Sequence, residues 1–132
     1  MASIVDIDQS KLYDELRLKF TLVGPEMSPY AGKKVRCTFF LTPDYPRNCP
    51  SLYVDDDLYH VNVNSKTNKV LFKRLLPKNW FDGIRLLQLI IEFLRVLRQP
   101  ESINYFPSVP GNKERYNQFK DDTGNYIKIA EM

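Results

Sequence analysis

Two neighbouring segments alternate apolar and polar residues with a period of two, and this pattern limits the fold more than any other feature. In residues 15–23, and again in 34–41, every second residue is apolar. A period of two places alternate side chains on opposite faces of a β-strand. Residues 3–8 and 51–54 add a strand-like segment on each side. The four segments predict an antiparallel meander with one buried and one solvated face.

The same alternation assigns side chains to the two faces. Residues that face outward on the two long strands are predicted to be Arg17, Lys19, Thr21, Arg36, Thr38 and Phe40. Those facing inward on the strand at 34–41 are Val35, Cys37, Phe39 and Leu41. Asp6 and Asp8 share the outer face with Arg17 and Lys19. If the first two strands pair, cross-strand ion pairs of ~0.2–1 kcal/mol each are expected.

A strong helical pattern follows an irregular segment at residues 55–77. From Leu86, apolar residues recur at i, i+3, i+4, i+7 and i+11, which predicts an amphipathic helix. Asp82 is its candidate N-cap and Pro100 ends it. Ile91 and Leu94 widen the apolar surface beyond one stripe, so we expect a central and largely buried helix.

Shorter helices are predicted in the last part of the chain. Residues 112–121 form the first, Thr123 and Gly124 break it, and residues 126–130 form a short last turn or helix. No repeat and no linker is visible along the sequence. Strands followed by helices therefore predict one α+β domain over residues 1–132.

Composition and charge exclude several classes of function. The first residues lack a basic start and an apolar run, and charged residues interrupt each apolar stretch, so neither secretion nor membrane insertion is expected. The net charge of +3 comes from scattered basic residues, which does not indicate a nucleic-acid partner. Two cysteines make no disulfide framework and favour a reducing compartment, the cytoplasm or the nucleus.

General catalytic and metal-binding patterns are missing from the sequence. His60 is the single histidine, and Cys37 and Cys49 lack the spacing of a zinc site. The run of three aspartates at 55–57 is typical of a solvated turn, and the five glycines form no phosphate-binding loop. We therefore expect no metal, no cofactor and no catalytic residue.

Three short motifs nevertheless resemble those of one enzyme family. Residues 24–32, GPEMSPYAG, are similar to the G-P-x-x-S/T-P-Y-x-G run of ubiquitin-conjugating enzymes. Residues 44–50, DYPRNCP, resemble their D-Y-P-F-x-P-P loop, and residues 58–62, LYHVN, resemble I-Y-H-P-N. Trp80 and Pro100 stand twenty residues apart, as do the tryptophan of the family and the proline after its central helix.

The resemblance covers about residues 13–100 and implies the ubiquitin-conjugating fold. That fold is α+β, with a four-stranded antiparallel meander packed on a central helix. The amphipathic N-terminal helix of the family has no counterpart here, because the residues before Tyr13 resemble a strand.

The chain departs from the family at the position of the thioester cysteine. Counting back eight residues from Trp80 gives Phe72, and counting forward from His60 gives Val70. Neither side chain has a nucleophilic atom. The family's oxyanion position holds Asn62, here interpreted as a structural turn residue, and its acidic gate matches the uncharged Asn104. The degenerate active-site region is therefore predicted to comprise His60, Asn62, Leu71, Phe72 and Asn104.

Two surfaces are candidates for binding proteins. Arg17, Lys19, Arg36 and Phe40 lie on the outer sheet face, which corresponds to the back side where the family binds ubiquitin non-covalently. A single exposed apolar residue such as Phe40 is also ordinary. The former active-site side carries Phe72, Lys73, Arg74 and Phe81, although Phe72 can equally fill the vacant cleft. Arg47 and Phe81 replace residues that the family uses to bind ligases.

These features predict an inactive ubiquitin-conjugating-enzyme variant. Its function is a protein-binding module or cofactor subunit in a ubiquitin or ubiquitin-like pathway. The expected partners are ubiquitin or a ubiquitin-like protein, an active conjugating enzyme or a ligase. The alternatives are a peptide-binding or scaffold adaptor in a larger complex and, less favoured, an active enzyme that uses another residue such as Cys49.

Overall fold

A computed structural model describes residues 4–12, 15–100 and 113–132. One antiparallel sheet contains five strands in sequence order. The strands are β1 (Ile4–Leu12), β2 (Glu15–Val23), β3 (Lys34–Leu41), β4 (Ser51–Val54) and β5 (Lys69–Val70). The predicted meander is confirmed. Strand β5 was not predicted, because two residues inside an irregular segment are too few to show a period.

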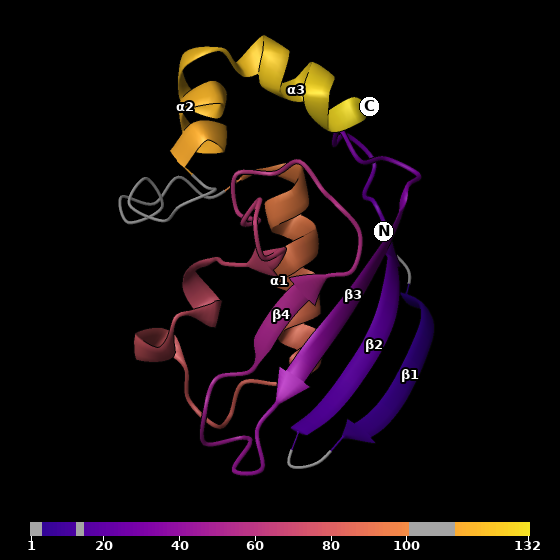
Figure 1. Ribbon diagram of the computed structural model, residues 1–132, viewed down its shortest axis with the longest axis vertical. Helices are drawn as coiled ribbons and strands as arrows, with labels where there is room; N and C mark the ends of the chain where they lie inside the picture. The colour runs from indigo at the N-terminus through magenta and orange to yellow at the C-terminus, as the bar shows by residue number, and fades with distance from the viewer. Residues whose placement is uncertain (1–3, 13–14, 101–112) are drawn as a thin grey trace.

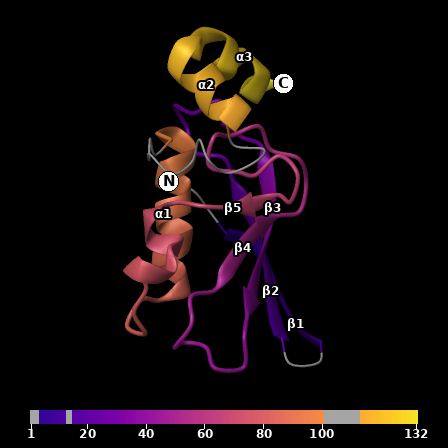
Figure 2. The same ribbon diagram turned by 60° about the vertical axis from the view of Figure 1, so that its left-hand side comes forward.

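The helices cover one face and one end of this sheet (Figure 1). They are α1 (Leu86–Arg98), α2 (Lys113–Asp121) and α3 (Thr123–Glu131), with the 3-10 turns η1 (Lys73–Leu75) and η2 (Pro77–Asn79) before α1. In Figure 2, α1 lies against one face, and the described residues place no helix on the opposite face. The fold is α+β, as predicted.

The core lies between α1 and the inner face of the sheet. Phe20 and Phe39 stack there with their ring centroids 5.2 Å apart. The four residues predicted to face inward from β3 are all buried. Those that α1 buries against them are Leu89, Ile90, Phe93, Val96 and Leu97.

The start and the exposure of α1 differ from the prediction. Asp82 is not the N-cap: the helix begins after Arg85, whose backbone N–H donates to Oε1 of Gln88 at 2.7 Å. Ile91 is 57% exposed and Leu87 is 56% exposed. The helix is therefore buried on one face rather than on most of its surface, because it packs on the sheet from one side.

The break between the last two helices also lies elsewhere. Thr123 and Gly124 belong to the first turn of α3 instead of separating the helices. Asp122 caps α3, since its carboxylate accepts a hydrogen bond from the backbone N–H of Asn125 at 3.4 Å. An aspartate cap satisfies a backbone donor that the helix itself leaves free.

Strand register corrects two expectations about the outer face. Asp8 lies opposite Lys19 as predicted, but Asp6 lies opposite Thr21 instead of a basic residue. Thr38 was expected to be solvated, yet it is 3% exposed. Its hydroxyl donates to a carboxylate oxygen of Asp55 at 2.8 Å, which satisfies the polar group in its buried position.

Two further findings concern the described part of the chain alone. No helix there has the length and apolar composition required to cross a membrane. Nor do residues 4–12, 15–100 and 113–132 bring together three side chains of the kinds that hold a metal ion.

Candidate functional site

Phe72 is a core residue in the segment that joins β5 to η1. Its side chain is 0% exposed, and its ring lies nearly parallel to that of Phe93 on α1, with centroids 6.3 Å apart. The Phe72 carbonyl accepts a hydrogen bond from the backbone N–H of Leu75 at 2.9 Å, which closes η1. The ring is therefore unavailable to a partner at the surface.

Asn62 and Leu71 lie together and hold this segment in place. The Asn62 side-chain amide donates to the Leu71 carbonyl at 3.0 Å, and the Leu71 backbone N–H donates to the Asn62 carbonyl at 2.8 Å. Asn62 is itself fully buried. Its amide thus faces backbone rather than an open cleft. Asn104, the fifth residue predicted for this region, lies outside the described residues.

His60 is buried and bonded to backbone on both ring nitrogens. Nδ1 accepts from the backbone N–H of Asn62 at 2.9 Å. Nε2 therefore carries the proton and donates to the Val96 carbonyl of α1 at 2.8 Å. Burial is the main reason that the pKa of His60 falls to about 4. A neutral ring held in this way joins the loop to α1 and is poorly placed to exchange protons with a substrate.

The burial of His60 predicts a pH-dependent stability. The unfolded pKa lies near 6.5 and the folded pKa near 4, so the unfolded state binds more protons between these values. The contribution of neutral His60 to the free energy of unfolding is therefore fully present above pH 6.5, and it is lost as the pH falls toward 4. We expect about 2 kcal/mol less unfolding free energy at pH 5 than at pH 7, measured by urea denaturation.

His60→Gln provides the control for this pH effect. Glutamine retains polar groups but has no titrating ring, so the loss between pH 7 and pH 5 is expected to shrink by more than half. An equally steep loss in the variant would contradict the assignment to His60.

A network of aromatic and basic residues, which was not predicted from the sequence, holds the loop that contains His60. The Tyr30 hydroxyl donates to the Tyr59 carbonyl, and the Tyr126 hydroxyl accepts from the Val61 backbone N–H at 2.8 Å. Burial raises the pKa of Tyr126 to about 12 and that of Tyr30 further. Tyr30 belongs to the GPEMSPYAG motif and Tyr59 to the LYHVN motif, which are the sequence signals for this network.

Arg115 of α2 is a further member of this network. Its guanidinium donates to the carbonyl oxygens of Leu58 and Val63 at 2.9 and 2.8 Å. The same group lies 5.0 Å from the centre of the Tyr59 ring. Burial lowers the pKa of Arg115. These contacts join α2 to the loop that contains His60.

Both cysteine thiols lie in surroundings that raise their pKa. Cys37 is buried on β3, and burial raises its pKa far above the ordinary value. Cys49 is half-buried, and desolvation raises its pKa as well. The Cys49 thiol donates to the Leu75 carbonyl at 3.2 Å. Because the thiolate is the reactive form, a raised pKa leaves little of it at neutral pH.

The outer sheet face brings several predicted residues together. The Arg17 guanidinium lies 5.1 Å from the centre of the Phe40 ring, which meets Tyr53 edge-on at 5.2 Å. A hollow of about 480 Å³, here called the outer-face hollow, is lined by Arg17, Lys19, Thr38, Phe40, Ser51, Tyr53 and Asp55. Phe40 is half-buried by these contacts and not the exposed aromatic that the alternation predicted.

Arg36 differs from its predicted neighbours on this face. Asp56 accepts two hydrogen bonds from its guanidinium, at 2.8 and 2.7 Å. The pair is exposed, so it contributes little to stability but places a carboxylate beside the Arg36 charge. Arg36 is also absent from the lining of the outer-face hollow.

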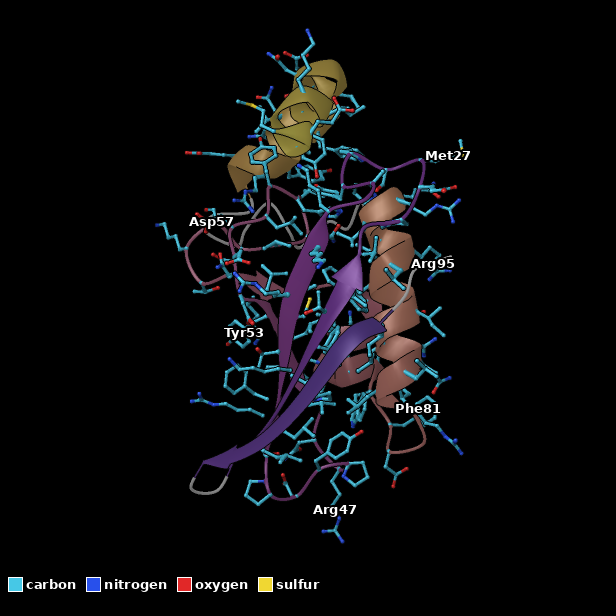
Figure 3. The ribbon with its side chains drawn as sticks, turned by 90° about the vertical axis from the view of Figure 1, so that its right-hand side faces the viewer. Met27, Arg47, Tyr53, Asp57, Phe81 and Arg95 are labelled. Carbon is cyan, nitrogen blue, oxygen red and sulfur yellow. The ribbon has the colours of Figure 1, made fainter. Side chains whose placement is uncertain are left out.

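Except for Phe72, the residues predicted for the second surface, together with Arg47 from the predicted ligase-binding positions, lie in three places. Lys73 and Arg74 lie beside α1, in a hollow of about 290 Å³ that they share with Asn79, Glu92 and Arg95. Phe81 is 59% exposed just before α1, and Arg47 lies in the loop after β3 (Figure 3). Trp80 joins these two regions, since its indole N–H donates to the Pro46 carbonyl at 2.8 Å. Phe72 belongs to none of them because its ring is in the core.

Comparison with known proteins agrees with the fold and the motifs. A family model described as ubiquitin-conjugating enzyme matches residues 3–132. This chain belongs to the ubiquitin-conjugating enzyme family. The family resemblance that the three sequence motifs indicated is thus confirmed.

Individual members of the family differ considerably from this chain. The human and bovine proteins named ubiquitin-conjugating enzyme E2 S are each 34% identical over 87 residues, which is 64% of this chain. The matched part spans 38% of the length of each of these relatives. The alignment therefore relates part of each protein, not the whole.

Solved structures of the family share the fold. A protein from Plasmodium yoelii assigned to the ubiquitin-conjugating enzymes has a TM-score of 0.74 and 22% identity, over 96% of this chain and 79% of its own. The E2 domain of a Toxoplasma gondii ubiquitin conjugating enzyme has a TM-score of 0.76 and 19% identity, over 95% and 84% of the two chains. At this identity the likeness establishes the fold of this family member.

Proposed function

We propose that this chain is a non-catalytic member of the ubiquitin-conjugating enzyme family. It acts as a protein-binding module or cofactor subunit in the conjugation of ubiquitin or a ubiquitin-like protein. One observation carries the proposal: Phe72, the residue that the motif spacing from Trp80 aligns with the thioester cysteine, is fully buried and stacked on Phe93.

The other ways of aligning the cysteine lead to the same proposal. Val70, obtained by counting from His60, is 1% exposed and has no nucleophilic atom. Cys49 is the more accessible of the two thiols, but its pKa is raised and its thiol donates to the Leu75 carbonyl. No arginine, lysine or imidazolium lowers its pKa enough to offset desolvation.

The outer-face hollow supports the binding part of the proposal. Arg17 stacks on Phe40, and the Arg17 Nε atom is buried without a hydrogen-bond partner. An arginine and two aromatic rings in one place are enriched where proteins bind each other. The partners proposed for this face are ubiquitin or a ubiquitin-like protein, and an active conjugating enzyme or a ligase is proposed for the molecule as a whole.

A location in the cytoplasm or the nucleus goes with this function. Both Cys37 and Cys49 are free thiols, as is usual in a reducing compartment.

A loading assay tests the catalytic part of the proposal. The chain is incubated with activating enzyme, ATP and ubiquitin, and the products are separated on a non-reducing gel. We expect no thiol-sensitive adduct, because no accessible thiolate is available to form the thioester. An adduct that disappears in Cys49→Ser would contradict the proposal.

The binding part is tested on the same protein preparation. Labelled ubiquitin is titrated with the chain and followed by NMR, with Lys19→Glu compared with Lys120→Glu. Both lysines are exposed, but Lys19 lines the outer-face hollow and Lys120 lies on α2. Weaker ubiquitin binding by Lys19→Glu alone would support the proposed face. Equal binding by the wild type and both variants would mean that ubiquitin contacts another surface.

A peptide-binding or scaffold adaptor remains the second candidate function. A groove of about 400 Å³ favours it, lined by apolar residues that include Pro29, Leu97 and Ile127. Pull-down from native lysate separates the two functions. Stoichiometric recovery of a scaffold complex without conjugation enzymes would favour the adaptor, whereas a salt-resistant conjugating enzyme or ligase would favour the cofactor subunit.

A further inference from the structure

The outward face of α1 exposes several apolar side chains in a group. Leu87 and Ile91 are 56% and 57% exposed and stand four residues apart, so they are neighbours on the same face. Leu94, which is half-buried, extends this row by one turn. Phe81 is 59% exposed just before the helix and points away from the sheet (Figure 3). Such a group of exposed apolar residues is typical of an interaction site.

Basic side chains surround these apolar residues. Within residues 73–98 the acidic side chains are Asp82 and Glu92, and the basic ones are Lys73, Arg74, Lys78, Arg85, Arg95 and Arg98. Exposed apolar and basic residues therefore share this side of the molecule. We call the set Phe81, Leu87, Ile91, Leu94, Arg74, Arg95 and Arg98 the α1 outer surface.

Glu92 forms ion pairs with two of these arginines. One carboxylate paired with two guanidinium groups leaves an excess of positive charge. One carboxylate oxygen of Glu92 lies 3.3 Å from Nε of Arg74, and the other lies 3.2 Å from Nη2 of Arg95. A single carboxylate thus holds two guanidinium groups, with the hollow of about 290 Å³ between them. Arg95 remains 67% exposed in this arrangement, so its remaining donors face solvent.

We propose that the α1 outer surface docks an acidic amphipathic helix of a partner protein. The partner carries apolar side chains at i and i+4, which pack on Leu87 and Ile91, and flanking Asp or Glu residues, which pair with Arg95 and Arg98. Side chains at i, i+4 and i+7 form a ridge, and the surface complementary to such a ridge is a second helix. Charge complementarity selects the acidic partner, and it disfavours a second copy of this basic face.

This surface is separate from the outer-face hollow of the proposed function. Tyr53, which lines that hollow, and Arg95 of α1 point to opposite sides of the sheet (Figure 3). Both surfaces are therefore open to partners at the same time. A failure to bind ubiquitin at the outer-face hollow would not contradict this inference. A failure to bind the helix at the α1 outer surface would likewise not contradict the proposed function.

The test uses the whole chain and a defined probe. The probe is a fluorescent 18-residue helical peptide with Leu at i, i+4 and i+7 and Glu on both flanks, followed by anisotropy at about 0.15 M salt. The matched peptide replaces each Glu by Lys. We expect the acidic peptide to bind and the basic one not to bind. Absence of binding by the acidic peptide, or equal binding by both, would overturn the proposal.

Matched substitutions locate the contact. Arg95→Glu and Ile91→Ser are each expected to raise Kd by about tenfold or more. Lys120→Glu makes the same charge change on α2, and Ile129→Ser makes the same apolar-to-polar change on α3, where Ile129 is 38% exposed; both are expected to stay within about twofold. An equal loss of peptide affinity in the two control variants would mean that overall charge or stability causes the effect. That result would overturn the assignment of the contact to the α1 outer surface.

Two further measurements need no substitution. Amide shifts of the wild-type chain upon peptide addition are expected to fall on α1 and η1, and shifts confined to other elements would overturn the proposal. Vesicles containing phosphatidylserine test the other class of anionic partner. Binding to these vesicles without binding to the acidic peptide would overturn the proposal and indicate an anionic lipid surface as the partner.

Discussion

Phe72→Ala is expected to lower the free energy of unfolding by about 3–5 kcal/mol, the range for truncating a buried aromatic residue. The Phe72 ring is 0% exposed and stacks on Phe93, so its removal leaves a cavity between the β5–η1 segment and α1. Urea denaturation followed by far-UV circular dichroism measures the change. The expected loss would show that the Phe72 ring contributes to the stability of the core.

Phe81→Ala is the matched control for Phe72→Ala. The same atoms are removed from a side chain that is 59% exposed, so a change within about 0.5 kcal/mol is expected. A cost below about 1 kcal/mol for Phe72→Ala would contradict the packing described for this ring. A cysteine placed at position 72 would likewise point into the core, and we expect it to restore no thioester formation.

Gly24→Ala is expected to lower the free energy of unfolding by about 3 kcal/mol, near the upper end for overpacking. A Cβ at Gly24 would lie 1.8 Å from the Tyr30 carbonyl oxygen and 2.6 Å from its carbon. Backbone cannot rotate away as a side chain can. The turn must therefore open, although Gly24 donates to the Lys33 carbonyl at 2.7 Å and accepts from the Gly32 N–H at 3.2 Å.

This substitution has a second, local consequence. Tyr30 carries the hydroxyl that donates to the Tyr59 carbonyl, so displacing it loosens the loop that contains His60. Thermal unfolding measures the overall effect, and hydrogen exchange of the Val61 amide reports the loop.

Gly124→Ala provides the comparison at a glycine without a close neighbour. Apart from its chain neighbours and the backbone of its own helix, no atom lies within 4 Å of the added Cβ, and Gly124 belongs to the first turn of α3. We expect unchanged stability or a gain of under about 1 kcal/mol, because alanine favours the helix. Similar losses at both glycines would mean that the close approach at Tyr30 does not determine the effect.

The hydrophobic periodicity of the sequence was sufficient to predict the strands and the helix that bury one face. Alternation in β2 and β3 predicted which residues face the core, and the register pairs Phe20 with Cys37 accordingly. The apolar stripe beginning at Leu86 predicted the side of α1 that packs on the sheet. Both results follow because period and burial are properties of the element itself.

The candidate site was predicted only in part. Counting from Trp80 indicated Phe72 at the position of the cysteine, and counting from His60 indicated Val70. Whether the Phe72 ring is exposed or fills the cleft was left open. The structure buries it against Phe93, 21 positions further along the chain. It also groups Lys73 and Arg74 with Glu92, which no periodic pattern in the sequence indicated.

The sequence by itself therefore determined strands β1 to β4, the alternation of inward and outward residues along them, the packed stripe of α1 and the family motifs. The tertiary structure decided which polar groups are satisfied by distant partners and which apolar groups remain uncovered. Arg115 reaches the Leu58 and Val63 carbonyls across more than fifty residues, and Thr38 is buried through Asp55. Ile91 stays exposed because one side of α1 suffices to cover the sheet. These outcomes depend on which surfaces meet in the folded protein. The residues concerned are far apart along the chain, so local sequence patterns cannot predict their contacts.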